Sequence, residues 1–230
     1  MRTTEHDPLT VRRHPASPRA AVLVLHGGQA DSERPARPWQ LAALRMGPVA
    51  RAVTAALPYE DVLMAQVRYR VRGWNGDRAD PARDTLRALD AVAERVGTVP
   101  TVLLGHSMGG RAALHAAGHP LVTGVVALAP WWPPAEPVDR TAGRHVIALH
   151  GDRDHVTSPA ETADCVRRAR EEAGARAGMA VIGGGDHGML RRAGLWHATT
   201  AALVAHLLDP GSSPDPLPEG CYGTGEFPVL

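Results

Sequence analysis

The stretch TVPTVLLGHSMGGRAALHAAG, residues 98–118, joins an apolar run to an alanine-rich segment through a short turn that contains glycine. Ser107 lies in this turn, between Gly105 and Gly109, in the pattern G-x-S-x-G. The residues before the turn are typical of a buried strand and those after it of a helix. A sharp turn between a strand and a helix exposes one side chain, so the sequence predicts a nucleophilic serine at position 107.

The two glycines have a steric reason in such a turn. The elbow is tight, so small residues are needed two positions before and two positions after the serine. The same turn aims the backbone N–H of Met108 and the positively polarised first turn of the helix at a reacting carbonyl. A glycine-rich turn with an incidental serine gives the same pattern, but the position between a predicted strand and a predicted helix favours the nucleophile.

Composition limits the classes of protein that fit. The 230 residues suffice for one buried core, and a net charge of +1 gives no pull toward nucleic acid, membranes or acidic partners. The N-terminal segment MRTTEHDPLTVRRHP lacks an apolar signal region, and no segment approaches the roughly 18 apolar residues that a membrane span needs. We therefore expect a soluble, cytoplasmic protein in which Cys165 and Cys221 are free thiols.

Short apolar runs alternate with helical periodicity along the chain, which is typical of βα units around a mostly parallel sheet. An edge strand is expected around residues 9–13. Further strands are expected at residues 20–27, 61–69, 100–105, 124–130, 145–151 and 178–184, and helices at about 38–57, 80–96, 108–118, 159–174 and 192–208.

The domain organisation follows from the same pattern. Residues 1–208 are expected to form one domain, and the Pro/Gly-rich residues 209–230 an irregular or mobile tail. The segment between the strand ending at Pro130 and the strand beginning near Arg144 is too short for a separate lid domain.

From these motifs, the chain resembles the α/β-hydrolase superfamily over roughly residues 20–208. The resemblance implies a three-layer fold, with a central sheet flanked by helices, and a triad in the order nucleophile, acid, histidine. In LVLHGGQADS, residues 23–32, it implies that the amide of Gly28 is the second oxyanion donor besides Met108, with Gln29 next in line.

The resemblance also points to the acid and the base. In LHGDRDHVTSP, residues 149–159, Asp154 follows Gly151 in the pattern G-x-x-D. Asp152 competes in the same loop, although it also fits a turn residue that bonds its own backbone. In VIGGGDHGML, residues 181–190, His187 follows the last expected strand, where the superfamily places its catalytic base.

Two loops expected beside the serine contain aromatic and basic residues. RYRVRGWNGDRAD, residues 68–80, carries Arg70 and Trp74, and WWPP, residues 131–134, begins with Trp131 and Trp132. Together with Gln29 these residues are candidates for substrate binding, in an aromatic-lined pocket with an arginine for a carboxylate. The alternative is structural: tryptophans that cover the sheet edge, and arginines that are solvated or pair with Asp77, Asp80 and Asp84.

The expected function is cleavage of a small carboxylic ester, thioester or lactone through an acyl-enzyme on Ser107, without a metal or organic cofactor. The partner is a small-molecule acyl substrate, and no nucleic acid or membrane is expected. The short connection resembles small carboxylesterases, acyl thioesterases and dienelactone hydrolases, although a strict dienelactone hydrolase has a cysteine nucleophile.

Three alternatives stay open. A metal hydrolase would use the histidines and aspartates of HGDRDH, residues 150–155. A hydrolase fold can also serve ligand binding or regulation, and the same site can transfer an acyl group to an alcohol.

Overall fold

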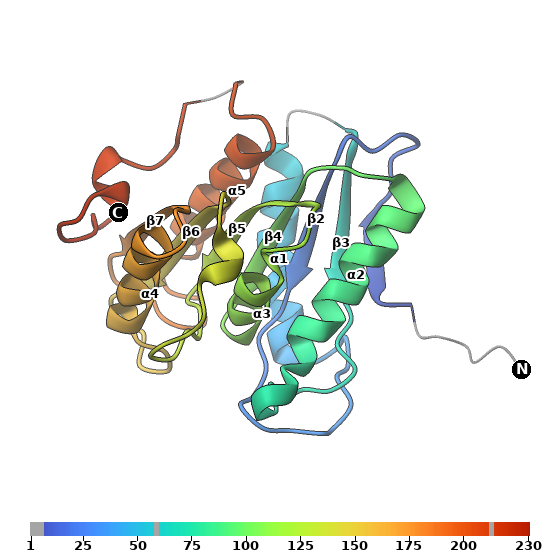
Figure 1. The fold of residues 1–230 in the computed structure, drawn as a ribbon, viewed down its shortest axis with the longest axis horizontal. Coiled ribbons are helices and arrows are strands. Elements are labelled where there is room, and N and C mark those ends of the chain that lie inside the picture. Colours follow the sequence, from blue (N-terminus) through green and yellow to red (C-terminus); the bar gives the residue numbers. More distant parts are fainter. Residues whose placement is uncertain (1–6, 58–59, 212–213) are drawn as a thin grey trace, which may run out of the picture.

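The computed structural model describes residues 7–57, 60–211 and 214–230 of the chain. Within them, seven strands form one sheet in the order β1-β3-β2-β4-β5-β6-β7 (Figure 1). β1 pairs antiparallel with β3, and all other neighbouring strands are parallel, which confirms the predicted sheet. The strands are β1 (Leu9–Arg13), β2 (Ala20–Leu25), β3 (Val62–Val67), β4 (Thr101–His106), β5 (Val122–Leu128), β6 (His145–Gly151) and β7 (Arg176–Ile182).

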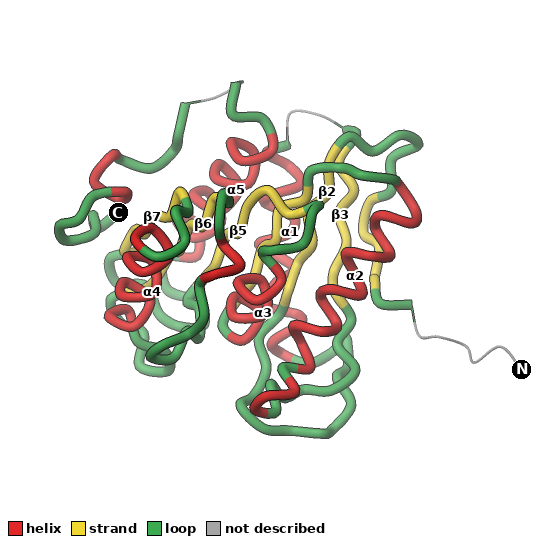
Figure 2. Tube along the Cα trace, in the orientation of Figure 1, coloured by secondary structure: helices red, strands yellow, loops and turns green. Residues whose placement is uncertain are grey.

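Helices cover both faces of this sheet, so the protein has three layers (Figure 2). α1 and α5 pack together over one core on one face, and α2, α3 and α4 pack over a second core on the other. The helices are α1 (Leu41–Ala56), α2 (Asp80–Val96), α3 (Met108–Ala116), α4 (Pro159–Glu171) and α5 (Ala193–Leu208). The predicted three-layer fold is confirmed.

The apolar runs of the sequence become the central strands. Every residue of β2 and of β4 is buried, because these strands lie between helices on both faces. Parallel strands end at the same edge of a sheet, so the loops after β2, β4, β6 and β7 meet there. The predicted catalytic and oxyanion-hole residues lie in these loops, at the carboxyl-terminal edge of the sheet.

The connection between β5 and β6 forms no lid. Residues 129–144 contain a single 3₁₀ turn, Asp139–Thr141, and otherwise cross the edge of the sheet as loop. Separately, none of the helices in the described ranges combines the length and the hydropathy that crossing a bilayer requires.

The described part of the tail is packed against β7 and α4 and includes one 3₁₀ turn, Glu219–Tyr222. The Val181 N–H donates to the Pro228 carbonyl at 2.8 Å, and the Leu230 N–H donates to the Val181 carbonyl at 2.8 Å. The guanidinium of Arg170 donates to the Gly223 carbonyl at 2.6 Å. The two bonds of Val181 occupy the outer edge of β7, whose backbone groups need partners, and the Arg170 bond joins the tail to α4. Cys221, in the tail itself, is buried, and both Cys165 and Cys221 are free thiols.

Candidate active site

Ser107 lies between β4 and α3 in a strained backbone conformation, with φ 54° and ψ −120°. A Cβ on Gly105 would lie 2.4 Å from the Gly109 carbonyl oxygen, and a Cβ on Gly109 would lie 2.3 Å from the Leu25 carbonyl oxygen. Neither position has room for a side chain. The glycines therefore permit the sharp turn that the sequence predicts, and the surrounding backbone holds Ser107 in it.

Of the two expected oxyanion donors, Met108 opens α3 and Gly28 lies against the Met108 side chain. Met108 is the first residue of α3, so its N–H has no carbonyl of that helix to bond. A Cβ on Gly28 would lie 2.3 Å from the Met108 Cε and 2.4 Å from the Arg72 carbonyl oxygen. Gly28 thus allows the loop after β2 to approach α3 closely.

Gln29 does not offer a third amide. Its N–H donates to the Arg72 carbonyl at 3.0 Å, and its carbonyl accepts from the Trp74 N–H at 2.9 Å. The N–H and the carbonyl of Gln29 are therefore both bonded to the β3–α2 loop, and Gln29 is exposed. Of the Gly28–Gln29 pair, Gly28 is the one that fits an oxyanion donor.

The loop after β6 resolves the choice between its two aspartates. Asp154 Oδ2 lies 2.8 Å from Nδ1 of His187, while Oδ1 accepts the backbone N–H groups of Val156 and Thr157 at 2.8 and 2.9 Å. Asp152 is exposed, and its carboxylate accepts the Gly184 N–H at 2.7 Å. The geometry pairs Asp154 with the histidine and makes Asp152 a turn residue.

The charge state of Asp154 follows from its surroundings. Burial alone would raise the pKa of this carboxyl, but the hydrogen bonds from His150, His187 and the loop amides outweigh burial and hold it well below its usual range. Asp154 is therefore ionised at neutral pH. An ionised acid can fix the imidazole tautomer of His187 and stabilise its cation.

His150 is a functional candidate that sequence reasoning assigned only to the metal alternative. Its Nε2 lies 3.2 Å from Asp154 Oδ2, and its Nδ1 lies 2.9 Å from the Thr162 hydroxyl. Neither the His150 nor the Asp154 side chain is accessible to solvent. When Nε2 carries the proton it donates to Asp154, and Nδ1 accepts from Thr162. The sequence signal that could have indicated this pair is the histidine four residues before the acid, at the end of the strand in HGDRD, residues 150–154.

The elbow and the base loop meet through His106. Its Nε2 donates to the His187 carbonyl at 2.8 Å, and the two imidazole rings lie 4.9 Å apart between centroids. Burial, together with the charge of His187, lowers the pKa of His106 to about 3, so this ring is neutral at physiological pH. The residue before Ser107 thus holds the backbone of His187.

The acid loop and the base loop also touch directly. A Cβ on Gly151 at the end of β6 would lie 2.2 Å from the Gly185 carbonyl oxygen. The Arg153 N–H donates to that same oxygen at 3.0 Å. The main chains therefore set the spacing of the two loops, and glycine at position 151 is a steric requirement.

The predicted aromatic pocket is corrected by the structure. Trp74 and Trp132 are 3% and 1% exposed and belong to the core beneath α2 and α3. The indole N–H of Trp132 donates to the Gly110 carbonyl at 3.2 Å. Trp131 is partly buried, and its backbone N–H donates to the Ser107 carbonyl at 3.2 Å. Two of the three tryptophans are core residues, and the third supports the elbow through its backbone.

Arg111 explains why these tryptophans face inward. Its guanidinium carbon lies 4.2 Å from the ring centroid of Trp74 and 4.6 Å from that of Trp131. Its Nε donates to the buried carboxylate of Glu136 at 2.8 Å, and His115 contacts the same carboxylate. This cluster joins two loops, β3–α2 and β5–β6, to α3 by cation–π and ionic contacts. No local sequence spacing links these residues, so it was not predicted.

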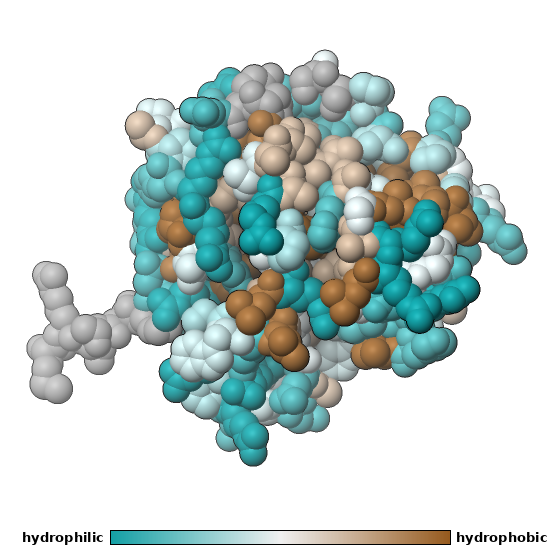
Figure 3. Space-filling view, turned by 180° about the vertical axis from the view of Figure 1, so that it is seen from behind, coloured by the Kyte–Doolittle hydropathy of each residue, from teal (hydrophilic) through white to brown (hydrophobic). Residues whose placement is uncertain are grey.

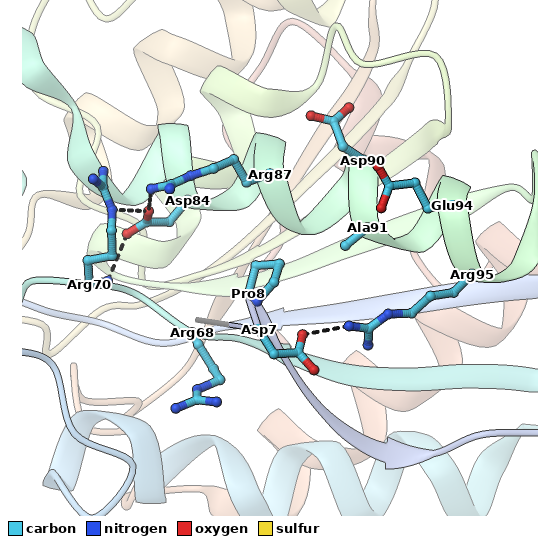
Figure 4. Close-up of a pocket in the computed structure, with 10 residues that line it drawn as sticks. All are labelled: Asp7, Pro8, Arg68, Arg70, Asp84, Arg87, Asp90, Ala91, Glu94 and Arg95. Carbon is cyan, nitrogen blue, oxygen red and sulfur yellow. Dashed lines mark hydrogen bonds and ion pairs between the residues drawn. The ribbon is translucent and has the colours of Figure 1, made fainter. Parts of the chain in front are cut away.

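The predicted substrate-binding role of Arg70 is also corrected, because the structure pairs this arginine with Asp84. Its Nε donates to Asp84 Oδ1 at 2.7 Å, and its backbone N–H donates to Asp84 Oδ2 at 2.9 Å. Figure 4 shows Arg70 and Arg87 both turned toward Asp84, in a cavity of about 540 Å³ between β1 and α2. Arginines and carboxylates alternate around this cavity, so Arg70 is an ion-pair partner of Asp84 and not a free cation beside Ser107.

In the described residues, the side chains of HGDRDH are not arranged as metal ligands. Asp152 and His155 are exposed, whereas His150 and Asp154 are buried against each other. No group of three or more His, Cys, Asp or Glu side chains in these ranges is arranged to hold a metal ion.

Comparison with known proteins identifies the family. A family model described as an alpha/beta hydrolase domain matches residues 18–208. The chain belongs to the alpha/beta-hydrolase family. The comparison with curated proteins finds no match to this alpha/beta hydrolase.

Solved structures share the alpha/beta-hydrolase fold at low sequence identity. Est1E from Butyrivibrio proteoclasticus, solved with ferulic acid, has 12% identity and a TM-score of 0.63, covering 87% of this chain and 94% of that one. Thermogutta terrifontis esterase 2, phosphonylated by cyclosarin, has 18% identity and a TM-score of 0.61, covering 88% and 89%. A serine hydrolase without a lid from Xanthomonas campestris has 17% identity and a TM-score of 0.58, covering 90% of each chain.

Proposed function

We propose that this alpha/beta hydrolase is a serine hydrolase that cleaves carboxylic esters or thioesters through an acyl-enzyme on Ser107. The observation that carries the proposal is the 2.8 Å contact between His187 Nδ1 and Asp154 Oδ2. The base loop is joined to the elbow of Ser107, held at φ 54°, by the bond from His106 to the His187 carbonyl. An ionised acid, an oriented imidazole and a partly accessible serine are the parts that acyl transfer needs.

In the first half of the reaction, Ser107 Oγ attacks the acyl carbonyl carbon while His187 Nε2 takes the hydroxyl proton. The carbonyl oxygen becomes an anion, and the amides of Gly28 and Met108 donate to it. The bond to the leaving oxygen or sulfur then breaks, and His187 returns the proton to that atom. Asp154 stabilises the imidazolium throughout.

In the second half, a water molecule takes the place of the leaving group. His187 removes a proton from the water, and the water oxygen attacks the acyl carbonyl. The bond to Ser107 Oγ breaks, the serine recovers its proton from His187, and the carboxylic acid leaves. No separate domain covers the site, since the connection from β5 to β6 is a short loop.

Labelling with a fluorophosphonate tests this proposal, read by intact mass and peptide mapping. We expect one adduct, on Ser107, and none in Ser107→Ala. His187→Ala should lose labelling while keeping the melting temperature of the wild type. An unreactive Ser107 in folded protein would contradict the proposal and favour a ligand-binding or regulatory role for the fold.

A panel of p-nitrophenyl esters, acyl thioesters and lactones then assigns the bond that is cleaved. We expect acid release to require Ser107 with every accepted substrate. Product analysis in the presence of an added alcohol separates hydrolysis from acyl transfer, because transfer yields a new ester and hydrolysis yields the free acid.

A further inference from the structure

Large apolar side chains are exposed on the loops around the candidate site. Val156 follows the acid by two residues and is 72% exposed, and Leu190 follows the base by three residues and is 74% exposed. Three more lie at the start of α1, where Leu41 is 79% exposed: Trp39, Leu41 and Leu44. In the described residues, only Val11 and Val229 share this property elsewhere. The apolar surface is therefore concentrated at the catalytic edge of the sheet.

The start of α1 and the base loop lie side by side. A Cβ on Gly188 would lie 3.5 Å from Cγ of Leu190 and 3.6 Å from Nη2 of Arg45. Arg45 is one helical turn after Leu41, so both project from the same side of α1. We define the apolar rim as the exposed side chains of Leu41 and Leu44 on α1, Val156 on the acid loop and Leu190 on the base loop.

The rim continues into a groove on the face that α1 covers. The groove has a volume of about 860 Å³ and runs between α1 and the β1–β3 edge of the sheet. Leu44, Pro38 and Met46 belong to its mainly aliphatic lining, and arginines of β1 and α1 border it. Figure 3 views this face, where apolar side chains lie among charged ones in its lower half.

An exposed apolar surface of this kind marks a binding site, because water is a poor solvent for it. Its position identifies the occupant. The rim begins two residues from the acid and three from the base, so it borders the place where an acyl carbonyl would react. The aromatic pocket that would hold a compact acyl group is closed by the inward tryptophans.

From this geometry, we propose that the substrates of this site are esters or thioesters of long aliphatic acids, with the acyl chain laid along the apolar rim and toward the groove beside α1. This rests on the proposed serine hydrolase function. Burying one CH₂ group favours binding by about fourfold, so even partial burial of a long chain discriminates strongly against acetate.

The test compares kcat/KM for p-nitrophenyl octanoate and p-nitrophenyl acetate in the full chain. We expect an octanoate-to-acetate ratio of at least about ten for the wild type, since a few of the six additional CH₂ groups suffice. Leu41→Asp and Leu44→Asp should each lower that ratio by about tenfold, because an alkyl chain lying on the rim would have to displace water from the new carboxylate. Both positions are exposed, so the variants should keep the wild-type melting temperature.

Val11→Asp is the matched control. Val11 is also an exposed apolar residue, but it lies on β1 on the same face as Leu9, which packs in the core beneath α2. This variant should leave the octanoate-to-acetate ratio unchanged. A wild type that prefers acetate would overturn the proposal. So would a ratio that Leu41→Asp and Leu44→Asp leave unchanged, or that Val11→Asp lowers equally.

Failure of the proposed function would look different. In that case fluorophosphonate would not label Ser107, and neither ester would be cleaved. Binding of cis-parinaric acid, a fluorescent long-chain acid, to Ser107→Ala then tests the rim without turnover. We expect binding that Leu41→Asp weakens and Val11→Asp does not, and an absence of binding would overturn the proposal.

Discussion

His150 Nε2 lies 3.2 Å from Oδ2 of Asp154, on the same carboxylate oxygen that His187 contacts at 2.8 Å. One carboxylate therefore serves two imidazoles, one toward the site and one in the interior. The interior histidine is anchored in turn by Thr162. His150 acts as a positioning residue, because it holds the acid that holds the base.

Removing this interior donor should lower turnover more than substrate binding. We expect His150→Leu to reduce kcat for p-nitrophenyl acetate by about tenfold to a hundredfold, with KM within about threefold, because Asp154 loses a donor and some of its orientation. His150→Gln, whose side-chain amide can donate to Asp154, should restore most of kcat. If the two variants have equal kcat at equal melting temperature, His150 does not position the acid.

The two aspartates of the acid loop should differ by orders of magnitude. Asp154→Asn should lower kcat/KM by about 10³-fold to 10⁴-fold, because the amide cannot stabilise the imidazolium and favours the wrong tautomer. Asp152→Asn is the matched control in the same loop, and its effect should stay within about threefold, since its exposed carboxylate bonds the Gly184 N–H and not the base. A larger loss in Asp152→Asn would reverse the assignment.

The cluster around Arg111 should contribute to stability. The Glu136 side chain is 1% exposed and pairs with Arg111, so Glu136→Gln should lower the free energy of unfolding by about 2 to 3 kcal/mol. Asp164→Asn removes an exposed carboxylate that pairs with Arg168 and should cost less than about 0.5 kcal/mol. Urea unfolding at pH 7 measures both, and equal losses would contradict a structural role for the buried pair.

The same variant predicts a pH dependence. Burial raises the pKa of Glu136, but the hydrogen bonds from His115 and Arg111 outweigh it and hold the pKa below its ordinary value of 4.5. A carboxyl with a lowered folded-state pKa stabilises the fold fully above its unfolded-state pKa and loses that contribution as the pH falls. The difference between wild type and Glu136→Gln should therefore be full at pH 7 and shrink below about pH 4.5. A difference that stays constant down to pH 3 would contradict the ionic role.

Local patterns predicted the parts of the site that local geometry builds. Ser107 needs only its two glycines, a strand and a helix, and all lie between Thr101 and Ala116. Asp154 and His187 were predicted from the resemblance to the α/β-hydrolase superfamily, which places the acid and the base in loops after late strands, here β6 and β7. These positions depend on chain order and strand direction, which a single sequence carries.

The surroundings of the site depend on contacts between distant segments. Trp74 is buried because Arg111 of α3 stacks on it, and Arg70 is occupied because Asp84 of α2 accepts from it. Both alternatives were visible in the sequence, but which one holds is decided by packing of separate helices and loops. The apolar rim was missed for the same reason, since exposure is a property of the assembled fold.

The close approach of Gly151 and Gly185 determines the distance between the acid loop and the base loop. Two main chains in van der Waals contact define the gap across which Asp154 reaches His187, and an added Cβ would approach to 2.2 Å. The spacing of the acid loop and the base loop is thus set by their main chains, and His150 orients the Asp154 carboxylate within that spacing. Gly151→Ala would therefore push the acid loop and the base loop apart, although it changes no titratable residue.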